Sequence, residues 1–273
     1  MPADRIPSLP RRPLGLLGAA GAVLATIGAA APAAAQSIDD LLTRKKLQVG
    51  ILIDLPPFGL ATGNNQYEGY DPDVARLMAR YLGVDLELVA VAGPNRIPFL
   101  LANKVDMLIA TFGITPERAR QVAFSIPYSS LDIELLAPRA TRIVTVDDLK
   151  TLKVGVPRAS GQDAVLSAIA PPGTRIMRFE DDATNAQAML SGQVDAIGAG
   201  IHIAQQIIKM NPSANYESKM LLRHQPNGIA LRRGQADLLQ WVNTFIYYVK
   251  NNGELDALYR KWLDGPMPEL PVF

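Results

Sequence analysis

Short apolar stretches rich in β-branched residues alternate with segments of helical period along most of this chain. Alternation of this kind predicts repeated βα units, and hence an α/β fold with a parallel or mixed sheet. The eight stretches are too many for one regular sheet. They comprise residues 47–53, 86–91, 107–111, 133–137, 154–157, 176–179, 194–199 and 229–231.

Two helical segments carry recognisable start and stop signals. Asp71 is suited to be an N-cap, Pro72 fits the first helical position, and Gly83 ends the apolar stripe that follows. The C-terminal segment from Gln235 to Trp262 has one long apolar stripe, and Gly253 is expected to divide it into two helices.

The first 35 residues are predicted to be a cleaved secretory signal peptide. Three arginines precede an apolar run from Leu14 to Ala31, and Ala33 and Ala35 fit a small-x-small cleavage site. We expect cleavage between Ala35 and Gln36 and a periplasmic protein. A membrane anchor is the alternative, but the run is rich in Ala and Gly and ends at Pro32. The sequence leaves open whether export is general or twin-arginine.

Composition narrows the classes of partner. The leader holds three of the 27 basic and one of the 26 acidic residues, which leaves 24 and 25 in the remaining 238. This near-neutral balance offers no electrostatic reason for a nucleic-acid or anionic-membrane partner. The chain has no cysteine, which excludes disulfides and thiolate chemistry. No second apolar run approaches the length of a membrane span.

Ten short motifs follow one another in an order that resembles the family 3 extracellular solute-binding proteins, the amino-acid receptors of bacterial ABC importers. The resemblance implies a type II periplasmic binding protein fold of the Venus flytrap kind. In that fold each of two lobes is a mixed sheet flanked by helices, two hinge crossings join the lobes, and the ligand lies between them. The motifs lie at residues 47–50, 56–58, 68–75, 95–100, 115–122, 124–128, 148–150, 154–156, 192–196 and 253–263.

Two polar, Pro-containing stretches, 138–142 and 223–227, suggest where the chain crosses between lobes. We therefore predict one lobe from residues 36–137 together with 225–273. The second lobe, residues 138–224, is inserted within the first.

The segment Thr115-Pro116-Glu117-Arg118 is the most informative motif for binding. Thr115 can cap a helix that starts at Pro116, and the free N–H groups there favour an anion. Arg118 adds a planar fork that suits a carboxylate. An arginine in a first helical turn is usually a solvated surface residue, but the resemblance implies that Arg118 grips the ligand's α-carboxylate.

A second anion site is expected after the strand at residues 154–157. Gly161 permits close approach to the backbone, and the amides of Ser160, Gly161 and Gln162 would point from a helix N-terminus toward the cleft. The alternative is an ordinary Ser160 N-cap.

Several positions depart from the family pattern. Gly113, after Thr111 and Phe112, stands where many members have a Ser or Thr that helps to hold the carboxylate. Leu55, before Pro-Pro-Phe58, stands where members usually have an aromatic residue that covers the ligand. We count all five positions as candidate ligand contacts.

The departure at Gly200 bears on the ligand's amino group. Amino-acid binders commonly place there an Asp that pairs with the α-ammonium, and an unpaired buried ammonium is costly. Either another acid serves, with Asp132 and Asp54 as candidates, or the ligand is an organic acid without an α-amino group.

No catalytic, metal or cofactor site is predicted. His202 and His224 lie 22 residues apart, without a nearby pair of ligands. The family also contains periplasmic dehydratases of the cyclohexadienyl dehydratase type, but residues 196–206 lack the catalytic carboxylate of those enzymes. We expect a monomer that presents a small carboxylate ligand to an ABC permease in the inner membrane. A ligand-sensing module is the remaining alternative.

Overall fold

Within the residues that the computed structural model describes, 37–63 and 66–271, eight strands form one continuous sheet. The strands β1, β5 and β6 pair in parallel at one end, and β8, β9 and β10 pair in parallel at the other. In sheet order the strands are β5 (Asp85–Ala90), β1 (Lys46–Ile51), β6 (Met107–Leu108), β11 (Tyr216–Arg232), β7 (Val122–Pro138), β10 (Ala196–Gly200), β8 (Lys153–Pro157) and β9 (Arg175–Phe179). The fold is therefore α/β with a mixed sheet, as predicted.

The two antiparallel strands β7 and β11 join the two ends of the sheet. Each is 17 residues long, far longer than the stretches 133–137 and 229–231 that the sequence indicated. Their length explains why eight strands make a single ladder, which we did not expect. In the described part of the chain a separate three-stranded sheet consists of β2 (Asp54–Leu55), β3 (Gly59–Gly63) and β4 (Gln66–Glu68).

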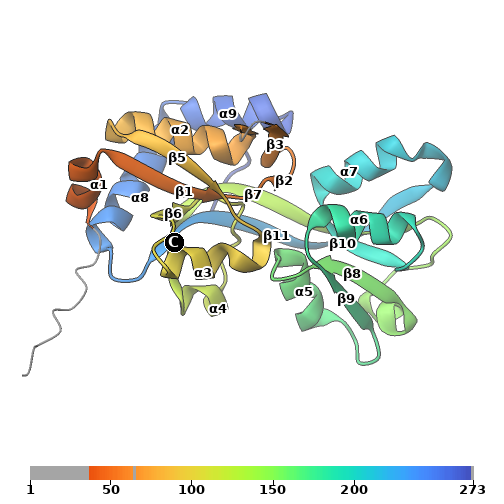
Figure 1. Ribbon diagram of the computed structural model, residues 1–273. Coiled ribbons are helices and arrows are strands. Elements are labelled where there is room, and N and C mark those ends of the chain that lie inside the picture. Colours follow the sequence, from red (N-terminus) through yellow and green to blue (C-terminus); the bar gives the residue numbers. More distant parts are fainter. Residues whose placement is uncertain (1–36, 64–65, 272–273) are drawn as a thin grey trace, which may run out of the picture. The chain divides into compact units, whose positions relative to one another are not determined.

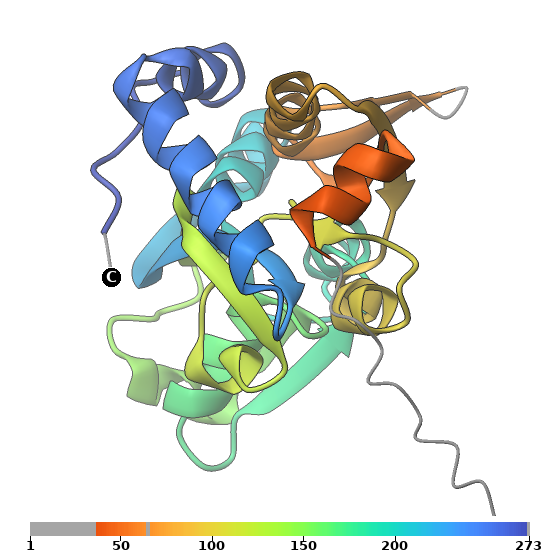
Figure 2. The same ribbon diagram turned by 90° about the vertical axis from the view of Figure 1, so that its left-hand side faces the viewer.

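The described residues belong to one compact unit in which the elements form two lobes. Figure 1 shows β1, β5 and β6 at one end of β7 and β11, and β8, β9 and β10 at the other end. Figure 2 views the molecule from the side of the first lobe and shows α8 (Ala236–Asn251) lying across β7, which it contacts. The predicted signal peptide, residues 1–35, lies outside the described residues.

Helices cover both ends of the sheet. On the first lobe, α2 contacts β1 and β5, and α8 contacts β7; on the second, α5 and α6 contact β8 and β10. The helices are α1 (Ile38–Arg44), α2 (Tyr70–Leu82), α3 (Arg96–Leu101), α4 (Pro116–Ala119), α5 (Gly161–Ile169), α6 (Asp182–Leu190), α7 (Ile201–Met210), α8 (Ala236–Asn251) and α9 (Glu254–Leu263), with 3₁₀ turns at Gly93–Asn95, Val146–Thr151 and Pro212–Ala214.

The helix boundaries confirm two predictions and correct one. Gly83 ends α2 with a φ of 68°, and Gly253, with a φ of 85°, separates α8 from α9. The prediction of Asp71 as an N-cap is wrong, because Gly69 occupies the cap and Asp71 lies inside the first turn, fully buried. The reason is that two hydroxyl groups from the core bind its carboxylate.

Two clusters of buried apolar side chains hold the strands in place. The larger one includes Leu47, Val49 and Ile51 of β1, and the smaller includes Val154 and Val156 of β8. Burial of these strands leaves the loops at their carboxyl ends as the parts free to form a site. No helix among the described residues is long and apolar enough to cross a membrane.

Candidate functional site: a pocket at the carboxyl ends of the strands

A hollow with a cavity volume of about 30 Å³ lies where the carboxyl ends of strands from both lobes meet. The loops after β1, β5 and β6 line one side, and the loops after β8 and β9 line the other. Leu131 of β7 and Gln225 of β11, which pair with each other, complete the lining. Ligands of open α/β sheets bind at this edge, because the loops there are free of the sheet's own packing.

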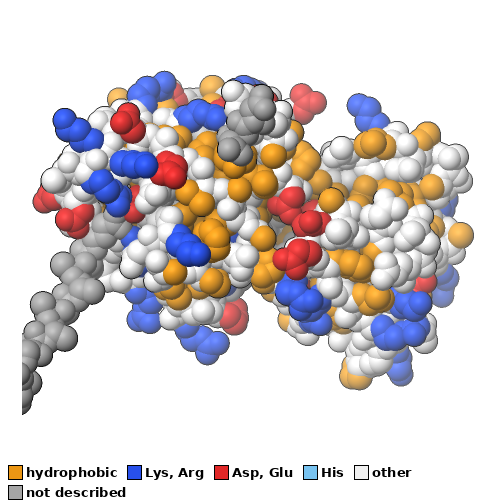
Figure 3. Space-filling model, in the orientation of Figure 1, with side chains coloured by type: hydrophobic (Ala, Val, Ile, Leu, Met, Phe, Trp, Pro, Cys, Tyr) orange, Lys and Arg blue, Asp and Glu red, His pale blue; other side chains and the backbone are white. Residues whose placement is uncertain are grey.

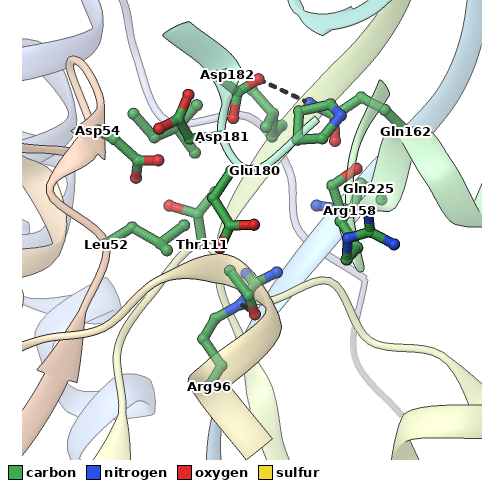
Figure 4. Close-up of a pocket in the computed structure, with 16 residues that line it drawn as sticks. Leu52, Asp54, Arg96, Thr111, Arg158, Gln162, Glu180, Asp181, Asp182 and Gln225 are labelled. Atoms are coloured by element: carbon green, nitrogen blue, oxygen red, sulfur yellow. Dashed lines mark hydrogen bonds between the residues drawn. The ribbon is translucent and has the colours of Figure 1, made fainter. Parts of the chain in front are cut away.

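Charges of both signs meet at this pocket. Figure 3 shows acidic side chains gathered in the hollow between the lobes, with basic side chains beside them. Figure 4 shows Asp54, Asp181, Asp182 and Glu180 around one side, Arg158, Gln162 and Gln225 around the other, and Arg96 below.

Of the predicted contacts, five line the pocket: Leu55, Thr111, Ser160, Gly161 and Gln162. The other six lie behind or beside it: Arg118, Phe112, Gly113, Thr115, Phe58 and Gly200. The structure thus brings together the two predicted anion-binding segments, but Arg118 lies behind the residues that line the hollow.

Arg118 lies over the ring of Phe112, with its guanidinium carbon 4.4 Å from the ring centroid. Its Nη1 donates to the carbonyl of Gly113 at 2.8 Å, and its Nη2 donates to the carbonyl of Ala159 at 2.9 Å. Thr115 caps α4 as predicted, since its hydroxyl accepts from the Arg118 amide. Burial, followed by repulsion from Arg96 and Arg223, lowers the pKa of Arg118 to about 9. Because burial and repulsion disfavour the charged form of Arg118, an anion bound next to it would stabilise that form.

Arg96 supplies a second guanidinium, which is buried and was not among the predicted site residues. It lies over the same ring, 4.6 Å from the centroid of Phe112, and its Nη2 donates to Ala159 O at 3.1 Å. Its other donors bind the carbonyls of Gly93 and Ala110. Burial lowers its pKa to about 10. Two guanidinium groups from the first lobe thus share one carbonyl of the second.

The loop after β8 supplies the Ala159 carbonyl and the start of α5. Ala159 has a φ of 56°, in the left-handed region, immediately before the Ser160 N-cap. The Ser160 hydroxyl accepts from the Asp163 amide at 3.0 Å. Ser160 is therefore an N-cap, as the alternative interpretation has it, and it also lines the pocket. Anion binding by this segment stays a prediction.

Thr111 reaches the pocket from the end of β6 in a conformation that is rare for a β-branched residue, with a φ of 46°. Its hydroxyl donates to Asp71 at 2.7 Å, and its amide donates to the Tyr128 hydroxyl at 3.2 Å. Tyr128 in turn donates to Asp71 at 2.7 Å. Burial raises the pKa of Asp71 to about 6, and these two hydroxyl hydrogen bonds oppose the rise. The network fixes Thr111 but occupies its side-chain donor.

Gly113 leaves room for Gln225. A Cβ at position 113 would lie 2.4 Å from the Gln225 Oε1, and a Cβ at Gly161 would lie 1.9 Å from the same atom. The side chain that fills the space of the missing Ser or Thr thus comes from β11, between loops of the two lobes. Gln225 is 2% exposed, and its Nε2 donates to Asn227 at 3.0 Å. Among the described residues, its Oε1 has no hydrogen-bond partner.

Leu55 and Phe58 have different surroundings, although both belong to one motif. Leu55 lines the pocket and is 5% exposed. The ring of Phe58 packs edge-on against Tyr70 and His202, with centroids 6.1 and 5.8 Å away, in the core behind the hollow.

Gly200 ends β10, where a Cβ would meet the side chain of Leu131 at 3.0 Å. Leu131 lines the pocket and fills the space next to Gly200. An acid at position 200 would thus need Leu131 to move. Of the two substitute acids named from the sequence, Asp54 lines this pocket.

The other named acid lies at a different hollow. Asp132 pairs with His224, with 2.8 Å between Nδ1 and Oδ1, in a hollow that His202 also lines. The described residues contain no group of three or more His, Cys, Asp or Glu side chains arranged to hold a metal ion.

The sequence analysis overlooked the acidic triplet Glu180-Asp181-Asp182 and the buried Arg96. A signal for the triplet was present, because it follows a predicted strand directly, as the Ser160 segment does. Carboxyl ends of neighbouring parallel strands share an edge, so the two segments were bound to be close. No local signal distinguishes Arg96 or Gln225, whose burial depends on packing between distant segments.

The fold and pocket together define a two-lobed solute-binding protein. The sequence profile of the bacterial extracellular solute-binding proteins, family 3, matches residues 47–265. The L-cystine-binding protein TcyJ of Escherichia coli K12 is 30% identical over 221 residues, which cover 80% of this chain and 83% of that protein. The chain belongs to this family, and the resemblance drawn from the motifs is confirmed.

Solved structures agree with this assignment. A variant of ArgBP from T. maritima has a TM-score of 0.76 and 31% identity, covering 84% of this chain and 99% of that one. The ancestral amino acid-binding protein AncCDT-1, a precursor of cyclohexadienyl dehydratase, has a TM-score of 0.74 and 32% identity, covering 82% and 98%. The predicted two-lobed binding-protein fold is thereby confirmed.

Proposed function

We propose that this protein captures an amino acid between its lobes and delivers it to the permease of an ABC importer. One observation carries the proposal: loops from both lobes bring guanidinium groups and carboxylates to a single pocket. A zwitterion presents the matching pair of charges. The relatives support an amino acid, since one is named for L-cystine and ArgBP has been solved bound to arginine.

In this proposal Arg118 binds the ligand's α-carboxylate. Its Nη2 now donates to the Ala159 carbonyl, a neutral acceptor at the rim of the pocket. A carboxylate is a stronger acceptor for a guanidinium, because the hydrogen bond is then assisted by charge. The ligand would therefore replace Ala159 O as the partner of Arg118, and its other oxygen would meet the free amides at the start of α5.

The two lobes are proposed to comprise residues 36–137 with 225–273, and 138–224. The Leu131–Gln225 pair of β7 and β11 lies against the pocket, slightly before the first of these boundaries, and we propose that the bend between lobes centres there. A ligand that touches both lobes binds the closed form better and so favours closure.

We also propose that the chain is a monomeric binding protein of the periplasm, with residues 1–35 as its signal peptide, no nucleic-acid partner and no enzymatic activity. The family is one of extracellular solute-binding proteins, and TcyJ is named as a binding protein. The structural relative linked to cyclohexadienyl dehydratase is itself described as an amino acid-binding precursor. Incubation with prephenate should accordingly give no product.

A thermal-shift screen tests the proposed function directly. Specific ligands stabilise the native state and raise its melting temperature. The panel pairs L-arginine, L-glutamine and L-cystine with organic acids that lack an α-amino group, including dicarboxylates. We expect an amino acid to give a saturable rise, confirmed by calorimetric titration. Stabilisation by organic acids alone would contradict an amino-acid ligand, and no stabilisation by either group would contradict a role in uptake of these solutes.

A further inference from the structure

Four acidic residues line the pocket, but the carboxylates of two of them already have hydrogen-bond partners or water around them. The Asp181 carboxylate caps α6, accepting from the Thr184 amide and hydroxyl, each at 2.7 Å. Glu180 is exposed, so water solvates its charge. The remaining two, Asp54 and Asp182, are half-buried and come from opposite lobes.

Within residues 37–63 and 66–271, neither Asp54 nor Asp182 forms an ion pair with a Lys, Arg or His side chain. Arg96 is the cation whose charge lowers the pKa of both, yet its three donor nitrogens bind the carbonyls of Gly93, Ala110 and Ala159. Asp182 accepts one hydrogen bond, from the neutral amide of Gln162 at 3.3 Å. Burial raises the pKa of both carboxylates, and the charge of Asp54 raises that of Asp182 further, to about 7.

A second observation, independent of the acids, indicates what the pocket lacks. Gln225 is 2% exposed and lines the pocket, and its Oε1 has no partner among the described residues. A buried acceptor without a donor costs about 1 to 3 kcal/mol, so such groups usually await a ligand or an ordered water. The Gln225 acceptor needs a hydrogen-bond donor, and the two carboxylates, which form no ion pair among the described residues, need positive charge.

The usual place for an ammonium partner is also closed here. The space beside Gly200 is filled by Leu131, which a Cβ on Gly200 would meet at 3.0 Å. The positive end of a ligand held by Arg118 must therefore find its counter-charge elsewhere in the same pocket.

We propose that Asp54 and Asp182, one from each lobe, form a subsite that holds a cationic N–H donor group of the ligand, an ammonium or a guanidinium. This inference rests on the proposed amino-acid-binding function and specifies where the positively charged group of the ligand binds. Without ligand the two carboxylates repel each other across the hollow. A cation between them turns that repulsion into two attractions, so the subsite ties ligand binding to closure of the lobes.

Two substitutions test the subsite, Asp54→Asn and Asp182→Asn, because each keeps the size of the side chain and removes the charge. The matched control is Asp39→Asn, which removes one charge from an exposed residue of α1, far from the pocket. Titration calorimetry with L-arginine, L-glutamine and L-cystine measures affinity for each variant. Loss of a buried charged partner typically weakens binding by roughly thirty-fold or more, so we expect that loss in both pocket variants and less than a two-fold change in the control.

Analogues identify which group of the ligand occupies the subsite. If it is the α-ammonium, the α-hydroxy analogue of the bound amino acid binds the natural protein weakly and is insensitive to Asp54→Asn and Asp182→Asn. If it is a side-chain cation, L-citrulline, the neutral counterpart of L-arginine, shows that insensitivity instead. Thermal unfolding of each variant checks that it folds.

The outcomes separate this inference from the function on which it rests. Binding of an amino acid with unchanged affinity in both pocket variants overturns the subsite and leaves the proposed function standing. Failure of every amino acid to bind the natural protein overturns both.

Discussion

Arg96 and Arg118 share the carbonyl oxygen of Ala159, at Nη2–O distances of 3.1 and 2.9 Å. A buried and a half-buried guanidinium group on one neutral acceptor are poorly neutralised, which is consistent with the lowered pKa of each. At the level of single residues, the pocket thus holds excess positive charge behind Phe112 and excess negative charge at Asp54 and Asp182. Both excesses would be relieved by one zwitterion.

The first prediction concerns Arg118. Replacing Arg118 by Ala removes the proposed partner of the carboxylate and should weaken amino-acid binding at least thirty-fold, the effect expected of a buried charged contact. Arg120→Ala is the control, because Arg120 is exposed two residues away on the same segment. Calorimetric titration gives both affinities. Equal affinities in the two variants would refute the carboxylate assignment.

The second prediction concerns the ionisation of Asp182. Its pKa is about 7 in the folded protein, raised by burial, Asp54 and Asp181 and opposed by Arg96, against an ordinary value of 3.8. Between about pH 4 and 7, the folded state therefore keeps a proton on Asp182 that the unfolded state has already released. This contribution to stability is complete below pH 4 and is lost as the pH rises through 7.

Asp182→Asn should accordingly unfold at the same temperature as the natural protein near pH 4 and at a higher temperature near pH 8. Linkage at about 1.4 kcal/mol per unit of pKa sets an upper limit of about 4 kcal/mol on the expected gain in the free energy of unfolding at pH 8, and the partial exposure of Asp182 reduces it. Thermal unfolding without ligand across this pH range measures it. A variant that is less stable than the natural protein at pH 8 would show that Asp182 is neutralised within the protein.

At the level of elements, the turn from β8 into α5 has little room beside Gln225. Gly161→Ala would place a Cβ 1.9 Å from the Gln225 Oε1 and 2.8 Å from Ile133. Added volume in a packed site usually costs about 1 to 3 kcal/mol. We predict a loss of that size in the free energy of unfolding, together with weaker ligand binding, because the displaced amide would enter the hollow.

The double variant Gly161→Ala with Gln225→Ala tests the cause. Since it removes the crowding atom, the two substitutions should be less destabilising together than the sum of each alone. Gly265→Ala is the control for a glycine with open surroundings, since its nearest contact to a Cβ would be 3.9 Å. Additive effects in denaturant unfolding would show that Gln225 does not set the cost.

At the level of the whole molecule, β7 and β11 are the strands that connect the two ends of the sheet. Their pairing shows register shifts between Asn227 and Gly228 and between Gly228 and Ala230, close to the pocket. Such irregularities interrupt the ladder and let strands bend. We propose that the two lobes move relative to each other at this region.

The last prediction is that a bound amino acid makes the protein more compact. A ligand that contacts both lobes stabilises the closed form, so small-angle scattering should give a smaller radius of gyration at saturating ligand. Arg118→Ala under the same conditions should keep the larger radius, because its ligand affinity is lost. An unchanged radius in the natural protein would mean that capture does not require closure, or that the lobes are already closed before the ligand arrives.

The sequence by itself indicated most of the strands and helices and the family. Strand and helix periods, glycine stops such as Gly83 and Gly253, and caps such as Thr115 and Ser160 are local features, each governed by a few neighbouring residues. The order of the ten motifs indicated the fold. The absence of an acid at position 200 predicts that either another acid pairs with the ligand's ammonium or the ligand lacks that group.

Only the tertiary structure decided how the pieces meet. Asp71 is a buried acceptor rather than a cap because Thr111 and Tyr128, far away in sequence, point hydroxyl groups at it. Gln225 fills the space left by Gly113 and Gly161, and Asp54 faces Asp182 across the hollow, because strands from two lobes bring their carboxyl ends to one place. The burial and the net charge at these positions depend on residues from distant segments of the chain. No local sequence pattern therefore contains them.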